Sequence, residues 1–126
     1  MLKKTKTLLA AIVLAGAGLG ASDRAFADAE ADQLFSFYCA QCHGKTGDGK
    51  GPNVVEDFPV TPRAFNSAAE MNKLTDADMR NVIRDGGPVA SKSPMMPPWG
   101  KTLSDAQIDK LVGKLRELCQ CKGKEG

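Results

Sequence analysis

Hydrophobic residues recur at helical spacing in the last quarter of the chain. Between residues 104 and 118 they share one helical face: Ile108, Leu111, Val112, Leu115 and Leu118. Ser104, followed three residues later by Gln107, has the pattern of a capping box, which marks a helix start. The sequence therefore predicts an amphipathic C-terminal helix, in which the cost of Gly113 is tolerable if this glycine permits close approach of two backbones.

Two earlier segments have the same periodicity. Thr75 is a typical N-cap residue, and the apolar positions that follow it (Met79, Val82 and Ile83) predict a helix that Gly86-Gly87-Pro88 ends. Residues 28–39 predict an N-terminal helix, whose apolar face consists of Leu34, Phe35 and Tyr38. We expect the C-terminal helix to pack across this N-terminal helix.

Long irregular segments separate the predicted helices. Residues 44–52 contain four glycines, so they predict a loop that makes sharp turns. Neither a preceding strand nor a glycine-lysine-serine/threonine ending is present, which excludes a phosphate-binding loop. Residues 53–74 have little periodicity and contain Pro59 and Pro62, which predicts a second loop with a short helical turn at 68–71.

The first residues of the chain are typical of an export signal. Lys3, Lys4 and Lys6 precede an apolar run at 8–19 and an A-x-A cleavage site at 25–27. Because about 12 apolar residues cannot span a hydrocarbon core of about 30 Å, we expect residues 1–27 to be a cleaved secretory signal peptide. Residues 28–126 then form one small domain, exported to the periplasm in soluble form.

Charge excludes two classes of partner. The domain at 28–126 has 13 basic and 14 acidic residues, interspersed along the chain. A near-neutral balance of this kind offers neither the basic surface that nucleic acid needs nor a polybasic patch for a membrane. We therefore expect no nucleic acid partner and no stable membrane insertion.

The strongest chemical signal is Cys39-Ala40-Gln41-Cys42-His43. A C-x-x-C-H run is typical of covalent haem attachment, in which two thiols bond the haem vinyl groups and the imidazole binds iron. On a helix, Cys39 and Cys42 lie one turn apart, so both thiols can meet one porphyrin edge. The motif predicts haem c bound by Cys39 and Cys42, with His43 as an axial ligand.

Two other chemistries use similar cysteine patterns. A thioredoxin-like redox pair expects a surrounding βαβ pattern, and no strand-like alternating run precedes Cys39. A zinc site could pair Cys39 and Cys42 with Cys119 and Cys121, although the second pair has C-x-C rather than C-x-x-C spacing. Cys119 and Cys121 themselves could form a local disulfide, link two chains or bind metal, and we favour a bridge.

The second iron ligand follows by elimination. His43 is the only histidine, so methionine is the obvious alternative. Met79 falls on a helix face and Met71 near a helix start, whereas Met95 and Met96 occupy a proline-stiffened loop, and composition does not choose between them.

Three further residues are candidates to contact the haem or its ligand. The Pro52 carbonyl could accept the second N–H of His43, although a proline that merely stiffens a turn fits equally well. Arg63 and Trp99 could hydrogen-bond the haem propionates, although an arginine is most often solvated surface.

Several motifs together resemble the class I c-type cytochromes, of the small bacterial periplasmic kind. The shared motifs are Ala-x-x-Leu-Phe before Cys39-Ala40-Gln41-Cys42-His43-Gly44, the Gly-x-Gly-x-Gly-Pro loop, Met96-Pro97-Pro98-Trp99-Gly100 and Leu103-Ser104-Asp105. The resemblance implies an all-α cytochrome c fold, with three to four helices and wrapping loops around one covalently bound haem. It also implies that Met96, not Met95, is the ligand, and that Pro52 accepts from His43.

The same resemblance implies how the terminal helices cross. In the family the N- and C-terminal helices cross at a small residue, which Ala31 matches, against an aromatic on the C-terminal helix. This chain has Lys114 at the aromatic position.

The function that these features predict is one-electron transfer by a carrier that is not an enzyme. Redox protein partners would dock transiently at the exposed haem edge, near Cys39, Cys42 and the Met96 loop, on a monomeric protein. Lys45, Lys50, Lys92 and Lys101 could steer an acidic partner, although scattered lysines are often only solvated surface. The alternative is a haem c gas sensor or peroxidase with a displaceable sixth ligand.

Overall fold

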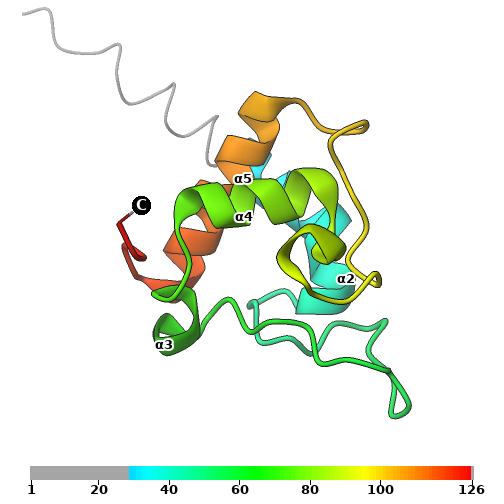
Figure 1. The fold of residues 1–126 in the computed structure, drawn as a ribbon. Helices are drawn as coiled ribbons and strands as arrows, with labels where there is room; N and C mark the ends of the chain where they lie inside the picture. Colours follow the sequence, from blue (N-terminus) through cyan, green and yellow to red (C-terminus); the bar gives the residue numbers. More distant parts are fainter. Residues whose placement is uncertain (1–28, 126) are drawn as a thin grey trace, which may run out of the picture.

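The computed structural model describes residues 29–125, and these residues are helical with no strand. The elements are the π-helix η1 (Phe35–Cys39), the α-helices α2 (Ala40–His43), α3 (Ala68–Met71), α4 (Asp76–Asp85) and α5 (Asp105–Cys119), and the 3-10 helix η2 (Gly87–Ala90) (Figure 1). This arrangement confirms the predicted all-α fold. The predicted signal peptide at residues 1–27 lies outside the described residues.

The N-terminal helical segment runs without a break into the cysteine motif. Residues 29–34 are α-helical, η1 follows, and α2 continues to His43. Within η1 the backbone widens by one residue, and the Ala40 N–H donates to the carbonyl of Phe35. The predicted N-terminal helix is confirmed, whereas the π turn was not predicted. Such turns occur frequently at functional sites, and this one ends at Cys39.

Helix α5 buries the apolar face that the sequence predicts. Ile108, Leu111, Val112 and Leu115 are all at most 4% exposed, and Ser104 and Gln107 form the predicted capping box. The helix packs across residues 29–34, because Lys110 binds Glu30 and Lys114 binds Asp32 at 2.6 Å. The predicted contact between the terminal helices is therefore confirmed.

Two details of this crossing differ from expectation. Nothing lies within 4 Å of the position that a Cβ on Gly113 would occupy, so the expectation that Gly113 lets two backbones approach was wrong. Lys114, at the family's aromatic position, has a side chain only 13% exposed and pairs with both Asp32 and Glu117. Lys114 therefore links the two helices through its ion pair with Asp32, at the position where the family has an aromatic.

Helix α4 lies against α5 in the centre of the molecule (Figure 1). Thr75 and Asp78 form a capping box at its start, and Gly86 ends it with φ at +86°. Met79 and Ile83 are buried, which confirms two positions of the predicted stripe.

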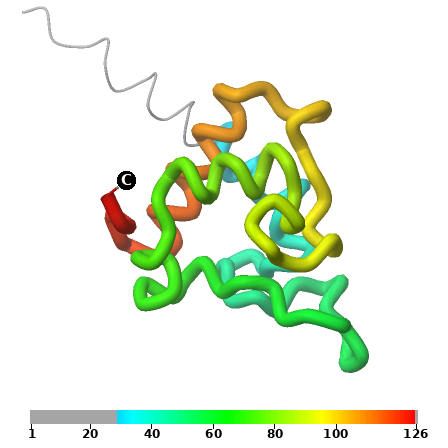
Figure 2. The backbone as a smooth tube through the Cα atoms, viewed as in Figure 1, coloured from blue at the N-terminus to red at the C-terminus, as the bar shows by residue number. Residues whose placement is uncertain are grey.

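Two long loops connect the helices and lie at the edges of the molecule. The backbone trace in Figure 2 shows the segment between α2 and α3 along the lower edge, and the segment between η2 and α5 along the right edge. The first of these loops ends at α3, the helical turn predicted at 68–71, which Ser67 caps. The cysteine motif therefore spans η1 and α2, and the glycine-rich and methionine motifs lie in the two loops.

Candidate haem site

The two cysteines of the motif lie at the junction of η1 and α2. Cys39 ends η1 and Cys42 lies one turn further on, in α2. Both thiols are free and half-buried, and burial raises the pKa of Cys39 to about 12. The structure therefore keeps the pair unbridged and one turn apart, as thioether attachment to one porphyrin edge requires.

The glycine-rich loop after His43 folds back onto the end of α2. A helix end leaves its last four carbonyls without intrahelical partners, and here all four accept hydrogen bonds from the loop. The pairs measure 2.8–3.0 Å: Asn53 N–H to Gln41, Gly51 N–H to Cys42, Gly49 N–H to His43 and Gly47 N–H to the C-cap residue Gly44. The loop is thus the cap of the motif helix.

Two of the glycines are needed for close backbone contact. A Cβ on Gly51 would lie 2.3 Å from the carbonyl oxygen of Gln41. Gly49 has φ of +77°, and a Cβ there would lie 2.6 Å from the Pro62 carbonyl oxygen. Side chains at either position would therefore push the loop off α2 or off the following segment.

The ring of His43 is oriented by the backbone of residue 63. Its Nδ1 lies 3.0 Å from the carbonyl oxygen of Arg63. Because a carbonyl only accepts, Nδ1 donates and carries the ring hydrogen, which leaves the Nε2 lone pair for a metal. The ring of Phe65 stacks on the imidazole, with ring centroids 4.1 Å apart. Both contacts fix the plane of the ring.

The surroundings of His43 also favour its neutral form. Burial lowers the pKa of His43, and the nearby Arg63 charge lowers it further, while the hydrogen bond to the Arg63 carbonyl partly opposes them. Metals bind the neutral imidazole, so a lowered pKa keeps the ring ready to act as a ligand.

The acceptor for His43 is not the one predicted from the sequence. Pro52 was expected to take this role, but the structure gives it to Arg63, so the prediction for Pro52 was wrong. The loop around Pro52 is bound to α2 instead, because the N–H groups of Gly51 and Asn53 donate to the carbonyls of Cys42 and Gln41. Pro52 itself is exposed.

The two residues predicted to contact haem propionates lie in different surroundings. The Arg63 guanidinium is half-exposed and pairs with Glu70 at 3.2 Å. Trp99 is half-buried, and its ring meets Tyr38 edge to face with centroids 5.0 Å apart. Both propionate contacts stay predictions.

The methionine loop distinguishes its two methionines by burial. Met96 is half-buried and packs against the core, whereas Met95 is 50% exposed. The Gly87 N–H donates to the carbonyl of Met96 at 2.9 Å, and a Cβ on Gly87 would lie 2.1 Å from the carbonyl oxygen of Ser93. The sequence reasoning treated Gly86-Gly87 only as a helix stop, and missed that the pair holds the methionine loop.

The remaining cysteines do not complete a metal site. Cys119 and Cys121 form a local disulfide, as favoured from the sequence. Among residues 29–125, no group of three or more histidine, cysteine or acidic residues could hold a metal ion. The four-cysteine zinc site is therefore excluded. Two free thiols one turn apart, followed by an imidazole with Nε2 left for iron, fit covalently bound haem instead.

Comparisons with known proteins agree with this chemistry. Residues 26–113 match the family described as cytochrome c oxidase, cbb3-type, subunit III. A search of curated proteins found no match. A solved structure, the KustC0563 c-type cytochrome, is 24% identical, with a TM-score of 0.57 over 70% of this chain and 95% of that one. The chain therefore belongs to this cytochrome c family, and is a small c-type cytochrome that carries covalently bound haem c and transfers electrons.

Proposed function

We propose that this cytochrome is a periplasmic single-electron carrier whose haem iron is bound by His43 and Met96. The observation that carries the proposal is the orientation of His43, whose Nδ1 is committed to the Arg63 carbonyl. The only imidazole of the chain thus presents Nε2, directly after two free thiols. Bound haem supplies the one-electron couple between Fe(III) and Fe(II).

The burial of Met96 supports its choice as the second ligand. A thioether is a weak ligand, so its loop must be held in place before it binds. The backbone of Met96 is held at both ends, because its N–H donates to Ser93 and its carbonyl accepts from Gly87. Met95 is exposed instead, and a methionine thioether on iron raises the reduction potential relative to two nitrogen ligands.

A carrier of this kind makes and breaks no substrate bond. It acts as a monomer and exchanges electrons through transient contacts near the Cys39, Cys42 and Met96 segments. Lys45, Lys50, Lys92 and Lys101 are all exposed on loops, where they could steer an acidic redox partner. Arg63 and Trp99 then contact the haem propionates.

Export to the periplasm is part of the proposal. None of the helices within residues 29–125 is long and apolar enough to cross a membrane. The lysine-led apolar run at residues 3–19 and the A-x-A site at 25–27 support cleavage before Asp28. Intact mass of the protein from a haem-competent bacterial host should equal residues 28–126 plus one haem, and a retained segment 1–27 would contradict the proposed cleavage.

The test of the ligand pair is a visible absorption spectrum of the oxidised and reduced protein. We expect a low-spin haem c spectrum, with the far-red band of methionine bound to ferric iron. Met96→Ala should abolish that band, while Met95→Ala should leave it unchanged. A high-spin spectrum without the band, or rapid binding of external ligands to the unaltered protein, would instead favour the sensor or peroxidase function.

A further inference from the structure

The Cys119–Cys121 disulfide constrains little of the chain. It joins the last residue of α5 to a residue only two positions later, and Gln120 between them adopts φ of +49°. The stabilisation that a cross-link gives is smaller the shorter the loop it closes. A loop this short leaves the unfolded chain nearly as free as before, so stabilisation is a weak explanation for the bridge.

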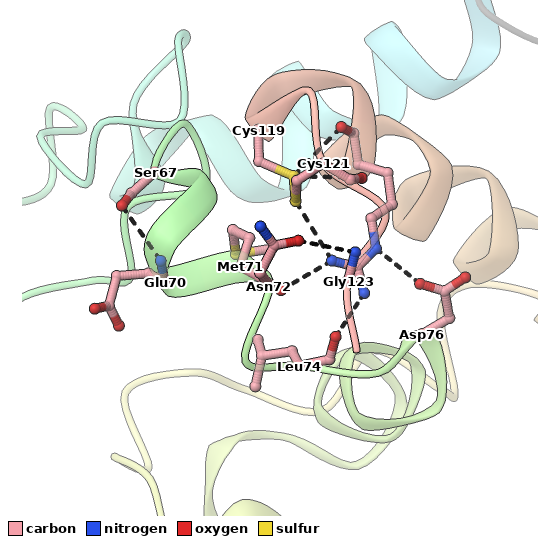
Figure 3. The surroundings of a disulfide bond; sticks show 10 residues. Ser67, Glu70, Met71, Asn72, Leu74, Asp76, Cys119, Cys121 and Gly123 are labelled. Atoms are coloured by element: carbon pink, nitrogen blue, oxygen red, sulfur yellow. Dashed lines mark hydrogen bonds and ion pairs between the residues drawn. A yellow bond between two sulfur atoms is a disulfide. The ribbon is translucent and has the colours of Figure 1, made fainter. Parts of the chain in front are cut away.

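The chain after the bridge is held by contacts of its own. The Gly123 N–H donates to Asn72 Oδ1 at 3.1 Å, and the Lys124 N–H donates to the Leu74 carbonyl at 3.2 Å. Figure 3 shows Asn72, Leu74 and Gly123 beside the bridge. These hydrogen bonds do not involve sulfur, so the C-terminal segment can stay docked when the bridge opens.

The two sulfur atoms have unequal surroundings. Cys119 is 5% exposed, whereas Cys121 is half-buried and more accessible to a partner. Nη1 of Arg116 lies 3.6 Å from Sγ of Cys121. A fixed cation beside a cysteine stabilises its thiolate, so Cys121 is the sulfur suited to exchange.

Arg116 is held in place by its other contacts. Its guanidinium donates to the carbonyls of Met71 at 2.9 Å and Leu74 at 2.7 Å, and pairs with Asp76 at 2.8 Å. Figure 3 shows Met71, Leu74 and Asp76 around the bridge. The cation therefore stays beside Cys121 whether the bridge is closed or open.

We propose that Cys119 and Cys121 form a thiol–disulfide exchange site that accepts two electrons from a protein dithiol. The first partner thiolate attacks Sγ of Cys121, the bond between the two sulfurs breaks, and Cys119 leaves and takes up a proton. The second partner thiolate then attacks the partner's own sulfur in the mixed disulfide and releases Cys121 as a thiolate beside Arg116. The partner ends as a disulfide, and its second proton goes to Cys121 or to water.

Dithiothreitol buffers test whether the bridge exchanges in the native protein. The full-length, haem-loaded protein is equilibrated with mixtures of reduced and oxidised dithiothreitol, and free thiols are then counted by maleimide mass labelling. We expect two labels, on Cys119 and Cys121, while the haem, which dithiothreitol also reduces, keeps the spectrum of the folded ferrous protein. A bridge that opens only after the protein unfolds would overturn the proposal. The haem spectrum reports the proposed electron carrier separately.

Arg116 variants test the role of the cation. In a Cys119→Ser background, Cys121 is the thiol left to react, and its alkylation by iodoacetamide at neutral pH gives a rate. We expect Arg116→Gln to slow that reaction at least about fivefold, and Arg116→Lys to retain most of the rate, because a thiolate needs the neighbouring charge. Arg80→Gln, which removes an arginine paired with Asp109, is the matched control. Equal rates in all variants would overturn the assignment.

Discussion

Gly51 and Gly113 differ in the space that the structure leaves for an added Cβ. A Cβ on Gly51 would lie 2.3 Å from the Gln41 carbonyl oxygen, within the cap of α2. We expect Gly51→Ala to lower the free energy of unfolding by about 1–3 kcal/mol, as overpacking does. Chemical denaturation of the haem-loaded protein measures the effect. Stability equal to that of the unaltered protein would mean that the cap does not need this contact.

Gly113 is the matched control for that change. It lies inside α5 with nothing within 4 Å of a Cβ position. Alanine loses less conformational entropy than glycine on forming a helix, so Gly113→Ala should raise the free energy of unfolding by about 1 kcal/mol. The same denaturation experiment tests both changes, and destabilisation by Gly113→Ala would show a contact that the structure lacks.

At the residue scale, the sequence predicts the chemistry of a motif better than it predicts the hydrogen-bond partners of the motif's side chains. Cys39, Cys42 and His43 are adjacent in sequence, so their spacing alone indicates the chemistry they share. The acceptor for His43 lies 20 residues away in an irregular segment, and it is a backbone carbonyl that any residue offers. Side-chain identity carries no signal for such a contact, and for this reason the sequence pointed to Pro52 instead of Arg63.

At the element scale, helix caps are local and therefore predictable. Ser104 accepts from the Gln107 N–H and starts α5, which buries much of the core. Ser104→Ala should lower the free energy of unfolding by about 1 kcal/mol, the usual contribution of an N-cap. Thr102→Ala, at an exposed position in the preceding turn, is the control and should change stability little. Equal effects of the two changes in a denaturant titration would argue against the cap.

The pairing between residues 29–34 and α5 gives the fold a dependence on pH. Hydrogen bonds from Lys110 and then Gln107 lower the pKa of Glu30 below its usual value of 4.5. The folded state therefore binds fewer protons than the unfolded state, so the contribution of the pair is present above that value and is lost as the pH falls. We expect Glu30→Gln to be less stable than the unaltered protein near neutral pH.

The difference in the free energy of unfolding between Glu30→Gln and the unaltered protein should shrink as the pH falls below about 4.5. Denaturant titrations of both proteins at several pH values measure it. Lys110→Met removes the other member of the pair, so its stability difference from the unaltered protein should depend on pH in the same way. A stability difference that is constant with pH would mean that the charge of Glu30 is not involved.

Not every feature of the elements could be predicted. The stripes of α4 and α5 follow the helical period, and burial of Met79, Ile83 and Ile108 agrees with them. The π turn at η1 follows no spacing rule that the sequence could have revealed. The role of Gly87 depends on a loop that returns to it from Ser93 and Met96.

At the scale of the whole molecule, surface charge should influence the rate of electron transfer. The four exposed lysines at positions 45, 50, 92 and 101 lie on the two long loops. If they steer an acidic redox protein, its rate of electron exchange should fall as ionic strength rises from about 0.01 to 0.2 M, because salt screens exposed charges. Stopped-flow kinetics measure the rate of electron exchange at each ionic strength. Lys122→Gln, which removes a lysine near the C-terminus outside the two loops, is the control and should leave this dependence unchanged. A rate independent of salt would contradict steering.

The cap on α2 also has a consequence for the order of folding. Its hydrogen bonds join residues within 40–53, and the acceptor for His43 is only 20 residues away, whereas the bond between Glu30 and Lys110 spans 80 residues. Contacts between sequence neighbours cost less loop-closure entropy and form sooner. The haem-attachment segment has low contact order and should organise early, so it is assembled before α5 closes over the N-terminal helix.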